Sequence, residues 1–267
     1  MSSFVCLSFD VEGWDPPLIY GVPSEHSLSL EYSAVGCRLL LGLFERLGVR
    51  STFFVTGTFA RACPDVVREL AVRGHDVSCH GDQHKVLKGL PRVEVYADVK
   101  SGKESVEKAS RVPVSGFRSP RNMINPCLYD VLSELSFAYD SSVHPAFIPG
   151  RLTEVLKRPG IHRVGKIVEV PSSTVFGLPI SWWWMRNLGL WYTKLGCEAS
   201  LMLHGYALLY FHAWEFTDVP RVKGVSGHMT KGTGAQFLRD VESLVVSLRK
   251  RGYGFGTIPD VIASQMR

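Results

Sequence analysis

The hydrophobic pattern of the chain alternates between two periods. Short runs rich in Val, Ile, Phe, Tyr and Thr predict buried strands, and longer runs with apolar residues every three or four positions predict helices. We expect strands at Phe4–Glu12, Ser51–Thr56, Asp76–His80, Val114–Pro120, Phe137–Val143, Ile167–Thr174, Leu208–Glu215 and Tyr253–Ile258. We expect helices at Val35–Leu47, Cys63–Arg73, Arg92–Ser110, Asn125–Leu135 and Gln236–Arg251.

The order of these elements predicts an α/β fold. Strands that alternate with helices over this length run parallel and are joined by crossover helices. The helix expected at Val35–Leu47 has an apolar stripe that begins with Val35 and Leu39, and Gly48 follows as a stop signal. The hydrophobic periodicity is compatible with both an open doubly wound sheet and a closed barrel.

Composition limits the class of protein. The chain has 267 residues, of which 45% are hydrophobic and 21% are charged, so we expect a globular fold rather than a disordered chain. The net charge of +5 comes from scattered basic residues, and a nucleic-acid-binding protein would more often show a basic stripe. No apolar run reaches the roughly 18 residues of a membrane-spanning helix, so no integral membrane segment is expected.

The N-terminus and the cysteines favour a cytoplasmic protein. Met1-Ser2-Ser3 lacks the basic region of a secretory signal. The six cysteines are far apart and contain no C-x-x-C pair, which argues against a zinc ribbon or a redox pair. Most have apolar neighbours, so we expect buried free thiols in a reducing compartment.

Ionisable side chains gather where five of the predicted strands end. In parallel α/β folds the carboxyl ends of the strands form the face that carries the active site. Five strands that bring such residues to one edge therefore predict a catalytic site there. The residues are Asp10 and Glu12, His80 and His84, Arg118 and Arg121, Asp140, and His212 with Glu215.

His80 and His84 are separated by three residues directly after a strand. Two imidazoles at this spacing can bind one metal ion when a turn follows the strand. Catalytic zinc usually has three protein ligands and one open position, so a carboxylate or another histidine would complete the set. The alternative is two unrelated histidines at the surface.

Asp10 and Glu12 lie two residues apart on the first strand, so their side chains point to the same face. When two carboxylates share one site, one can bind a metal ion and the other can act as a general base. The alternative is a solvated polar face. It fits poorly with Phe4–Leu7 and Phe9, which indicate a buried strand.

Arg118 and His212 each follow a stretch with few other charges. We expect Arg118 to pair with a buried carboxylate and keep it ionised, although an arginine here could simply cap a strand end. We expect His212 to donate a proton to a leaving amine. The alternative for His212 is a core histidine bonded to the backbone.

In this order the residues resemble the polysaccharide deacetylase superfamily, the NodB-homology domain of carbohydrate esterase family 4. Each motif is weak alone, but five in the right order are specific, and they span residues 8–212. The motifs are Ser8-Phe9-Asp10-Val11-Glu12-Gly13, His80-Gly81-Asp82-Gln83-His84, Arg118-Ser119-Pro120-Arg121, Tyr139-Asp140-Ser141-Ser142 and Leu209-Tyr210-Phe211-His212.

The resemblance implies a distorted (β/α)7 barrel in a single domain over residues 1–267, and metal-dependent hydrolysis of an N-acyl group on an amino sugar or polysaccharide precursor. One divalent metal ion, expected to be Zn2+, would be held by Glu12, His80 and His84. Asp10 would be the general base and His212 the proton donor. The same resemblance implies that Arg118 orients Asp10 and that Asp140 belongs to the catalytic set.

The resemblance also implies substrate contacts by Arg121, Leu209 and Trp214, with the backbone N–H of Arg121 facing the oxyanion. Arg121 stands where the family usually has an aromatic residue, which suggests an anionic or larger substrate. The D-x-E spacing of Asp10 and Glu12 resembles cytoplasmic branches of the superfamily. The stretch from Phe211 to Phe216 resembles the branch associated with exopolysaccharide biosynthesis and favours a sugar substrate.

Two alternatives to this function remain. Relatives with the same fold hydrolyse the C–N bond of cyclic amides, as in allantoinase-like or imidase-like enzymes, or remove a formyl group from formamido sugars. A narrow pocket would favour a cyclic amide, and an open groove would favour a glycan. A catalytically dead barrel that only binds glycan or a partner is less consistent with the presence of Asp10, Arg118 and His212.

Four tryptophans, Trp182, Trp183, Trp184 and Trp191, fall within the segment Ile180–Leu195. Such rings stack on sugars, line interfaces between proteins or lie at a membrane surface. We therefore expect a substrate platform or an interface, and a homo-oligomer would fit the second. The alternative is a core helix, or one packed on a sister subunit.

Overall fold

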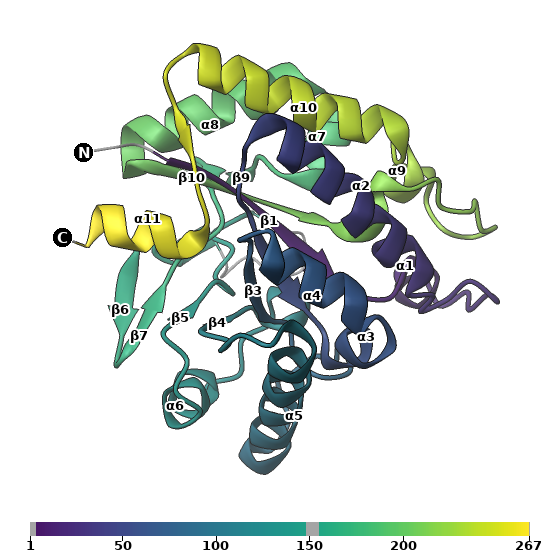
Figure 1. Ribbon diagram of the computed structural model, residues 1–267, viewed down its shortest axis with the longest axis vertical. Helices are drawn as coiled ribbons and strands as arrows, with labels where there is room; N and C mark the ends of the chain where they lie inside the picture. Colours follow the sequence, from purple (N-terminus) through teal and green to yellow (C-terminus); the bar gives the residue numbers. More distant parts are fainter. Residues whose placement is uncertain (1–3, 148–154, 267) are drawn as a thin grey trace.

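The computed structural model describes residues 4–147 and 155–266, so residues 1–3, used above in the argument about a signal, lie outside the described residues. A curled and mostly parallel sheet forms its centre (Figure 1), in the order β10-β1-β2-β3-β4-β5-β7-β6. Strand β6 is antiparallel to β7, and β11 pairs with the beginning of β1. The strands are β1 Phe4–Val11, β2 Thr52–Val55, β3 Asp76–Cys79, β4 Gly116–Phe117, β5 Tyr139–Asp140, β6 His162–Val164, β7 Ile167–Glu169, β10 Tyr206–His212 and β11 Gly254–Phe255, with a separate hairpin of β8 Thr174–Val175 and β9 Leu178–Pro179.

The segment that follows β7 brings the two sides of the sheet together. The backbone N–H of Ser173 donates to the carbonyl oxygen of Leu208 at 2.9 Å, and the N–H of Leu208 donates to Oγ of Ser173 at 2.9 Å. The Tyr206 hydroxyl donates to the carbonyl oxygen of Pro171 at 3.0 Å. The sheet is therefore a curled half-barrel closed by an irregular segment, and the distorted barrel of NodB type is confirmed.

Helices cover the outside of this sheet. Helices α10, α2, α4 and α5 follow one another around it, each in contact with the next (Figure 1). The helices are α1 Pro16–Ile19, α2 Glu31–Leu47, α3 Gly57–Ala62, α4 Pro64–Val72, α5 Arg92–Ser110, α6 Leu128–Glu134, α7 Trp182–Leu188, α8 Leu190–His204, α9 Gly227–Thr230, α10 Ala235–Lys250 and α11 Ile258–Gln265, with 3-10 turns η1 Pro120–Asn122 and η3 Ala213–Phe216.

Strand β1 shows how the fold positions the site. Its side chains alternate between two buried faces, as a strand requires. The outward set, which includes Leu7 and Phe9, packs in the core beneath the helices. The inward set begins with Cys6 in a second apolar cluster and then becomes polar at Ser8 and Asp10. The barrel interior is therefore apolar at one end and chemically active at the other.

Two details of the helices differ from the sequence-based expectation. Helix α2 begins at Glu31, and Val35 and Leu39 are 41% and 40% exposed, although the pattern placed them on the buried stripe. The buried face instead combines small residues, such as Ala34 and Cys37, with the larger Leu40, Leu43 and Phe44. The small side chains let the first half of the helix approach its neighbours closely, so the buried face there is rotated away from Val35 and Leu39. The expected stop at Gly48 is confirmed by its left-handed conformation.

None of the helices within residues 4–147 and 155–266 is long and apolar enough to cross a membrane. All six cysteines are free thiols, as the sequence predicted. Cys6, Cys37, Cys79 and Cys197 are buried, whereas Cys63 and Cys127 are partly exposed.

Candidate active site

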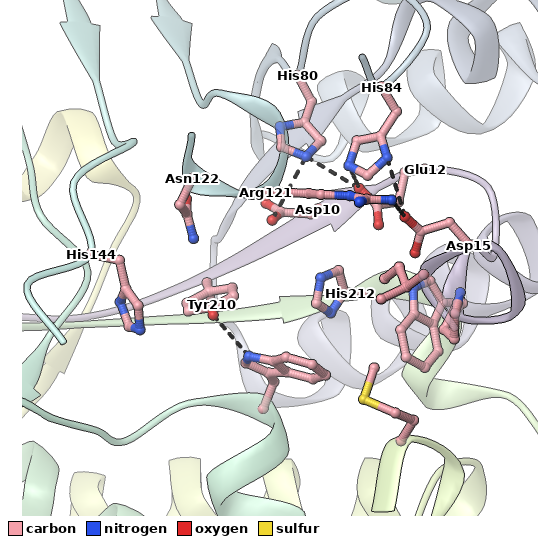
Figure 2. A pocket seen from close by; sticks show the side chains of 15 residues that line it. Asp10, Glu12, Asp15, His80, His84, Arg121, Asn122, His144, Tyr210 and His212 are labelled. Atoms are coloured by element: carbon pink, nitrogen blue, oxygen red, sulfur yellow. Dashed lines mark hydrogen bonds and ion pairs between the residues drawn. The ribbon is translucent and has the colours of Figure 1, made fainter. Parts of the chain in front are cut away.

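A pocket opens where the parallel strands end, and it contains most of the predicted site residues. Its volume is about 270 Å³. Figure 2 shows Glu12, Asp15 and His84 on one side of it and Asn122 and His144 on the other. The lining residues are Asp10, Glu12, Asp15, Pro16, Ile19, His80, His84, Arg121, Asn122, His144, Trp182, Tyr210, His212, Trp214 and Met229.

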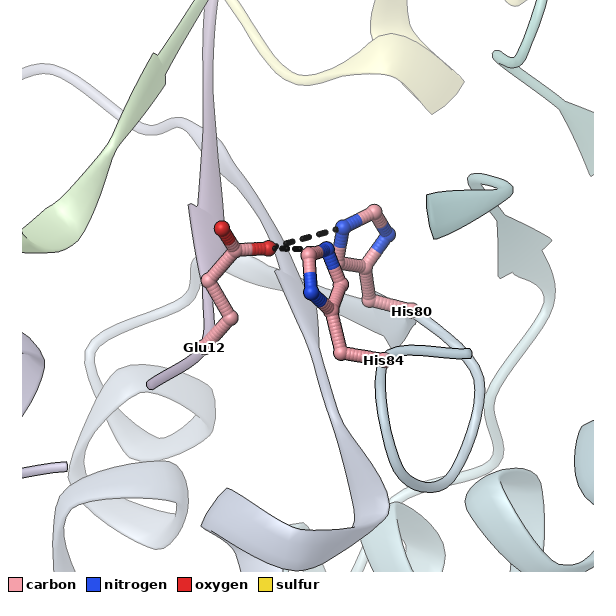
Figure 3. A group of neighbouring side chains, drawn as sticks. All are labelled: Glu12, His80 and His84. Atoms are coloured by element: carbon pink, nitrogen blue, oxygen red, sulfur yellow. Dashed lines mark ion pairs between the residues drawn. The ribbon is translucent and has the colours of Figure 1, made fainter. Parts of the chain in front are cut away.

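The three predicted metal ligands converge in this pocket (Figure 3). Their ligand atoms all lie within 4.8 Å of one another. Oε2 of Glu12 is 3.2 Å from Nε2 of His80 and 2.7 Å from Nε2 of His84. His80 is 1% exposed, so the reading of two unrelated surface histidines does not describe this pair.

Neighbouring groups orient both imidazoles. Nδ1 of His80 lies 2.8 Å from the carbonyl oxygen of Arg118, so Nδ1 carries the proton and Nε2 presents its lone pair to the cluster. Nδ1 of His84 lies 3.7 Å from Oδ2 of Asp15. One carboxylate and two imidazoles with such outer partners form a donor set that suits a divalent ion such as Zn2+.

The turn between the two histidines depends on a glycine. Gly81 has φ of 71°, and a Cβ there would lie 2.8 Å from Oδ2 of Asp98 on α5. That carboxylate accepts the backbone N–H of Asp82 at 3.0 Å. A larger residue would therefore strain the backbone and push away the Asp98 carboxylate that accepts the N–H of Asp82. Gly81 lets the chain turn tightly enough to bring His84 back beside His80.

Asp10 and Arg118 form a buried ion pair beside the metal-ligand cluster. Nη1 of Arg118 donates to Oδ1 of Asp10 at 2.8 Å, and Oδ2 of Asp10 is 3.9 Å from Nε2 of His80. Arg118 also donates to Oγ of Ser8 at 2.9 Å and of Ser141 at 3.0 Å. Arg118 does not line the pocket; it fixes the carboxylate of Asp10, which does line it.

His212 lies in the same pocket and is held by Glu215. The 3-10 turn η3 follows β10, and it places Oε2 of Glu215 2.8 Å from the backbone nitrogen of His212 and 3.4 Å from its Nδ1. Trp214 stacks on the imidazole with ring centroids 5.2 Å apart, and Trp182 contacts it edge-on at 4.8 Å. The imidazole is therefore fixed by a carboxylate and two indole rings.

The carboxylates around His212 favour its protonated form. Burial alone would lower the pKa of His212, but the hydrogen bond to Glu215 and the charges of Glu12 and Asp10 outweigh it and raise the pKa to about 9. His212 is thus protonated near neutral pH, as a proton donor must be. Its contacts are with carboxylate and indole side chains at the pocket, which argues against a purely structural core histidine.

One of the three expected substrate contacts, Leu209, does not line the pocket. The structure places Leu209 fully buried on the outer face of β10, in the core with Leu7 and Phe9, so it cannot touch a molecule in the pocket. Strand alternation puts Tyr210 on the inner face instead, and Tyr210 lines the pocket. Trp214 does border the pocket, as expected.

Arg121 lines the pocket, but its charge is balanced. Its Nη2 donates to Oδ2 of Asp15 at 2.9 Å. The suggestion of an anionic substrate rested on Arg121 as a cation available to the substrate. The pairing with Asp15 removes that support. The position of Arg121 at the pocket remains consistent with substrate contact.

Asp140 does not line the pocket, in contrast to its expected place in the catalytic set. It is fully buried beside Glu169, and burial raises the pKa of its carboxyl. Oδ1 of Asp140 accepts the Ser142 hydroxyl at 2.7 Å, and that Oγ accepts the backbone N–H of Ser119 at 2.8 Å. Asp140 thus fixes the backbone next to Arg118 and is a positioning residue.

Sequence reasoning missed several pocket residues. Asp15, Asn122 and His144 are not among the predicted site residues, yet all three line the pocket. Strand alternation counted back from His212 could have identified Tyr210. For Asp15 and His144 the sequence offers no comparable signal, because both lie in irregular segments just after strands.

The tryptophan-rich segment forms two helices rather than one. Gly189, with φ of 94°, separates α7 from α8. Trp182, at the beginning of α7, lines the pocket, whereas Trp191 on α8 is 63% exposed. The expectation that this segment borders the site is therefore met by Trp182, and an interface role for Trp191 stays a prediction.

Part of the chain is similar in sequence to polysaccharide deacetylases. The family model for polysaccharide deacetylase matches residues 33–139. The chitooligosaccharide deacetylase of Bradyrhizobium sp. (strain ANU 289) is 29% identical over 119 residues, which are 43% of this chain and 50% of that protein. The chain thus spans about half the length of this curated relative.

Solved structures show the same fold over nearly the whole chain. A Mycobacterium smegmatis structure assigned to the polysaccharide deacetylases has a TM-score of 0.71 at 21% identity, covering 98% of this chain and 89% of that one. A family 4 pseudoenzyme from Bacillus anthracis has a TM-score of 0.59 at 13% identity, covering 97% of this chain and 65% of that one. Because a pseudoenzyme shares the fold, activity must be argued from the site. The polysaccharide deacetylase model thus matches part of the chain, and the chain has the fold of the solved polysaccharide deacetylases over nearly its whole length.

Proposed function

We propose that the protein is a metal-dependent hydrolase that removes the N-acetyl group from an amino sugar or polysaccharide precursor. The observation that carries the proposal is one pocket that holds an Arg118-paired Asp10, the cluster of Glu12, His80 and His84, and a protonated His212. These are the groups that acyl hydrolysis needs. A base activates water, and an acid protonates the leaving amine.

The metal-ligand cluster accounts for the electrophilic part of the chemistry. A divalent ion held by Glu12, His80 and His84 would polarise the acyl carbonyl and lower the pKa of a water molecule. We expect Zn2+, because two imidazoles and a carboxylate with an open position form a ligand set typical of catalytic zinc.

The remaining steps belong to side chains of the chain itself. Asp10, oriented by its pair with Arg118, takes the proton of the attacking water at Oδ2, the oxygen to which Arg118 does not donate. His212 gives its proton to the amine as the C–N bond breaks, and Glu215 stabilises the charged imidazole before that transfer. The backbone N–H of Arg121 faces the developing oxyanion in this proposal.

The size of the pocket favours a second candidate as well. A cavity of about 270 Å³ suits a single ring better than several linked sugars. It also suits a small cyclic amide, so an imidase-like C–N hydrolase is the second candidate. The six free cysteines fit the cytoplasmic location that we propose.

The deciding experiment follows product release from purified, metal-loaded protein. The panel contains N-acetylated hexosamines, a formamido sugar, short chitin oligomers and cyclic amides. We expect acetate from the N-acetylated sugars, and loss of turnover after chelation that added Zn2+ restores. Ring opening of a cyclic amide without acetate release would favour the second candidate. Chelator-insensitive turnover would contradict the assigned metal site.

A further inference from the structure

The wall of the pocket away from the metal-ligand cluster carries a second group of polar side chains. Figure 2 shows Asn122, His144 and Tyr210 on this side, while Glu12 and His84 lie on the other. The mechanism uses none of these three side chains. They come from three separate parts of the chain, which are the turn η1, the segment after β5 and strand β10.

Tyr210 presents a hydroxyl proton in this wall. Its Oη accepts the indole N–H of Trp182 at 2.8 Å, and within the described residues the hydroxyl has no other hydrogen bond. Burial raises the pKa of Tyr210, so the phenol keeps its proton. Because the oxygen already accepts from Trp182, the hydroxyl is oriented and its proton is available to a bound molecule.

Asn122 offers both a donor and an acceptor. It has φ of 53°, a left-handed conformation that asparagine tolerates better than most residues. Its backbone N–H donates to the carbonyl oxygen of Ser119 at 2.9 Å. Its side-chain amide has no hydrogen bond within residues 4–147 and 155–266, and the residue lines the pocket.

The remaining surface of the pocket indicates what these groups bind. Arg121 is paired with Asp15, so it adds no uncompensated positive charge for an anion. Trp182, Trp214 and Met229 add apolar surface. A molecule complementary to this surface is neutral, with hydroxyl groups along one edge and C–H groups on its faces. A sugar ring has this character.

We propose that Asn122 and Tyr210 form a hydroxyl-binding subsite for the ring of a neutral N-acylated hexosamine, placed across the pocket from the metal-ligand cluster. This inference rests on the proposed function and identifies the hydroxyl groups of the sugar ring as the part of the substrate that this wall of the pocket binds. Trp182 is a positioning residue in it, because it fixes the Tyr210 hydroxyl.

Binding without turnover tests the subsite. Calorimetry on metal-loaded Asp10→Asn protein would compare N-acetylglucosamine with its 3-, 4- and 6-deoxy analogues, with and without Tyr210→Phe. One hydrogen bond between neutral groups corresponds to about three- to tenfold in affinity, so Tyr210→Phe should weaken N-acetylglucosamine binding by that factor. One deoxy analogue should bind the Asp10→Asn protein more weakly than N-acetylglucosamine does, by a similar factor. Adding Tyr210→Phe should not weaken the binding of that analogue further.

A second variant and a control complete the design. Asn122→Gly keeps the left-handed backbone conformation accessible. It should also weaken the binding of N-acetylglucosamine and leave the affinity for one deoxy analogue unchanged, whether or not that analogue is the one identified with Tyr210→Phe. Tyr96→Phe on α5, outside the pocket, should leave every affinity unchanged. Circular dichroism would verify that each variant is folded.

The outcomes separate the subsite from the proposed function. If the sugars bind but neither Tyr210→Phe nor Asn122→Gly weakens them, the subsite is wrong and the proposed function stands. Equal losses for all deoxy analogues in both variants would also overturn the subsite. If no N-acetylhexosamine binds and a cyclic amide does, the proposed function itself is overturned.

Discussion

Arg186 and Glu215 form a fully buried ion pair, in which Nε of Arg186 donates to Oε1 of Glu215 at 2.8 Å. The other two nitrogens of Arg186 donate to the carbonyl oxygens of Lys231 and Met229. The pair leaves Oε2 of Glu215 directed at His212. Helix α7, through Arg186, therefore determines how the proposed proton donor is held.

The first prediction concerns the pKa of His212. In metal-free protein its imidazole should titrate near pH 9, measured by NMR, because Glu215, Glu12 and Asp10 favour the charged form. Glu215→Gln should move the midpoint to lower pH. In active enzyme the same change should shift the basic limb of kcat to lower pH, since His212 must be protonated to donate.

The same group contributes to stability with a defined sign. Its folded pKa of about 9 lies above the ordinary value of 6.5, so its contribution is complete below pH 6.5 and is lost as pH rises from 6.5 to 9. Glu215→Gln should also destabilise by about 3–5 kcal/mol, because it leaves Arg186 buried without a counter-charge. Arg186→Met added to it should recover part of that loss, and a larger loss in the double variant would contradict this account.

The second prediction concerns the metal. His80→Ala should lose stoichiometric metal by elemental analysis, because it removes one of three converging ligands. His204→Ala at the end of α8 is the matched control and should keep it. Full metal content in purified His80→Ala would show that the cluster is not the binding site.

The third prediction separates the base from the ligands. Asp10→Asn should retain metal and lose about 10²–10⁴-fold in kcat, since the amide can still accept from Arg118 but cannot take a proton. Asp130→Asn on α6 should change neither property. Near-normal kcat in Asp10→Asn would remove Asp10 from the role of base.

The fourth prediction concerns the tryptophan-rich segment. Binding of N-acetylglucosamine should change the tryptophan fluorescence, and Trp182→Phe should reduce that change, because Trp182 is one of the two tryptophans that line the pocket, with Trp214. Trp191→Phe should leave the response to sugar intact, since Trp191 is exposed on α8. A spectrum that is insensitive to sugar in the parent protein would refute a substrate platform. A change on dilution that Trp191→Phe abolishes would instead support the interface role.

Local patterns in the sequence predicted the parallel strands of the main sheet and the edge at which they end, but not the antiparallel β6 or the hairpin of β8 and β9. Alternation along β1 fixes Asp10 and Glu12 on one face, and this is a property of the strand alone. The His80 and His84 pair is also local, because a turn of five residues contains both. For these residues the sequence was sufficient, and the structure brings them together with His212 in one pocket.

Only the tertiary structure decided which groups surround those residues. Glu215 could be seen near His212 in the sequence, but its burial depends on Arg186, which lies 29 residues earlier. Asp15 neutralises Arg121 across 106 residues, and this changes the expected charge of the substrate. Such pairs form when separately folded segments dock, and the energy of burying a charge without its partner selects them. Short-range periodicity does not depend on which distant segments pack together. It could therefore locate the proposed catalytic groups but not the charged side chains that pair with their neighbours.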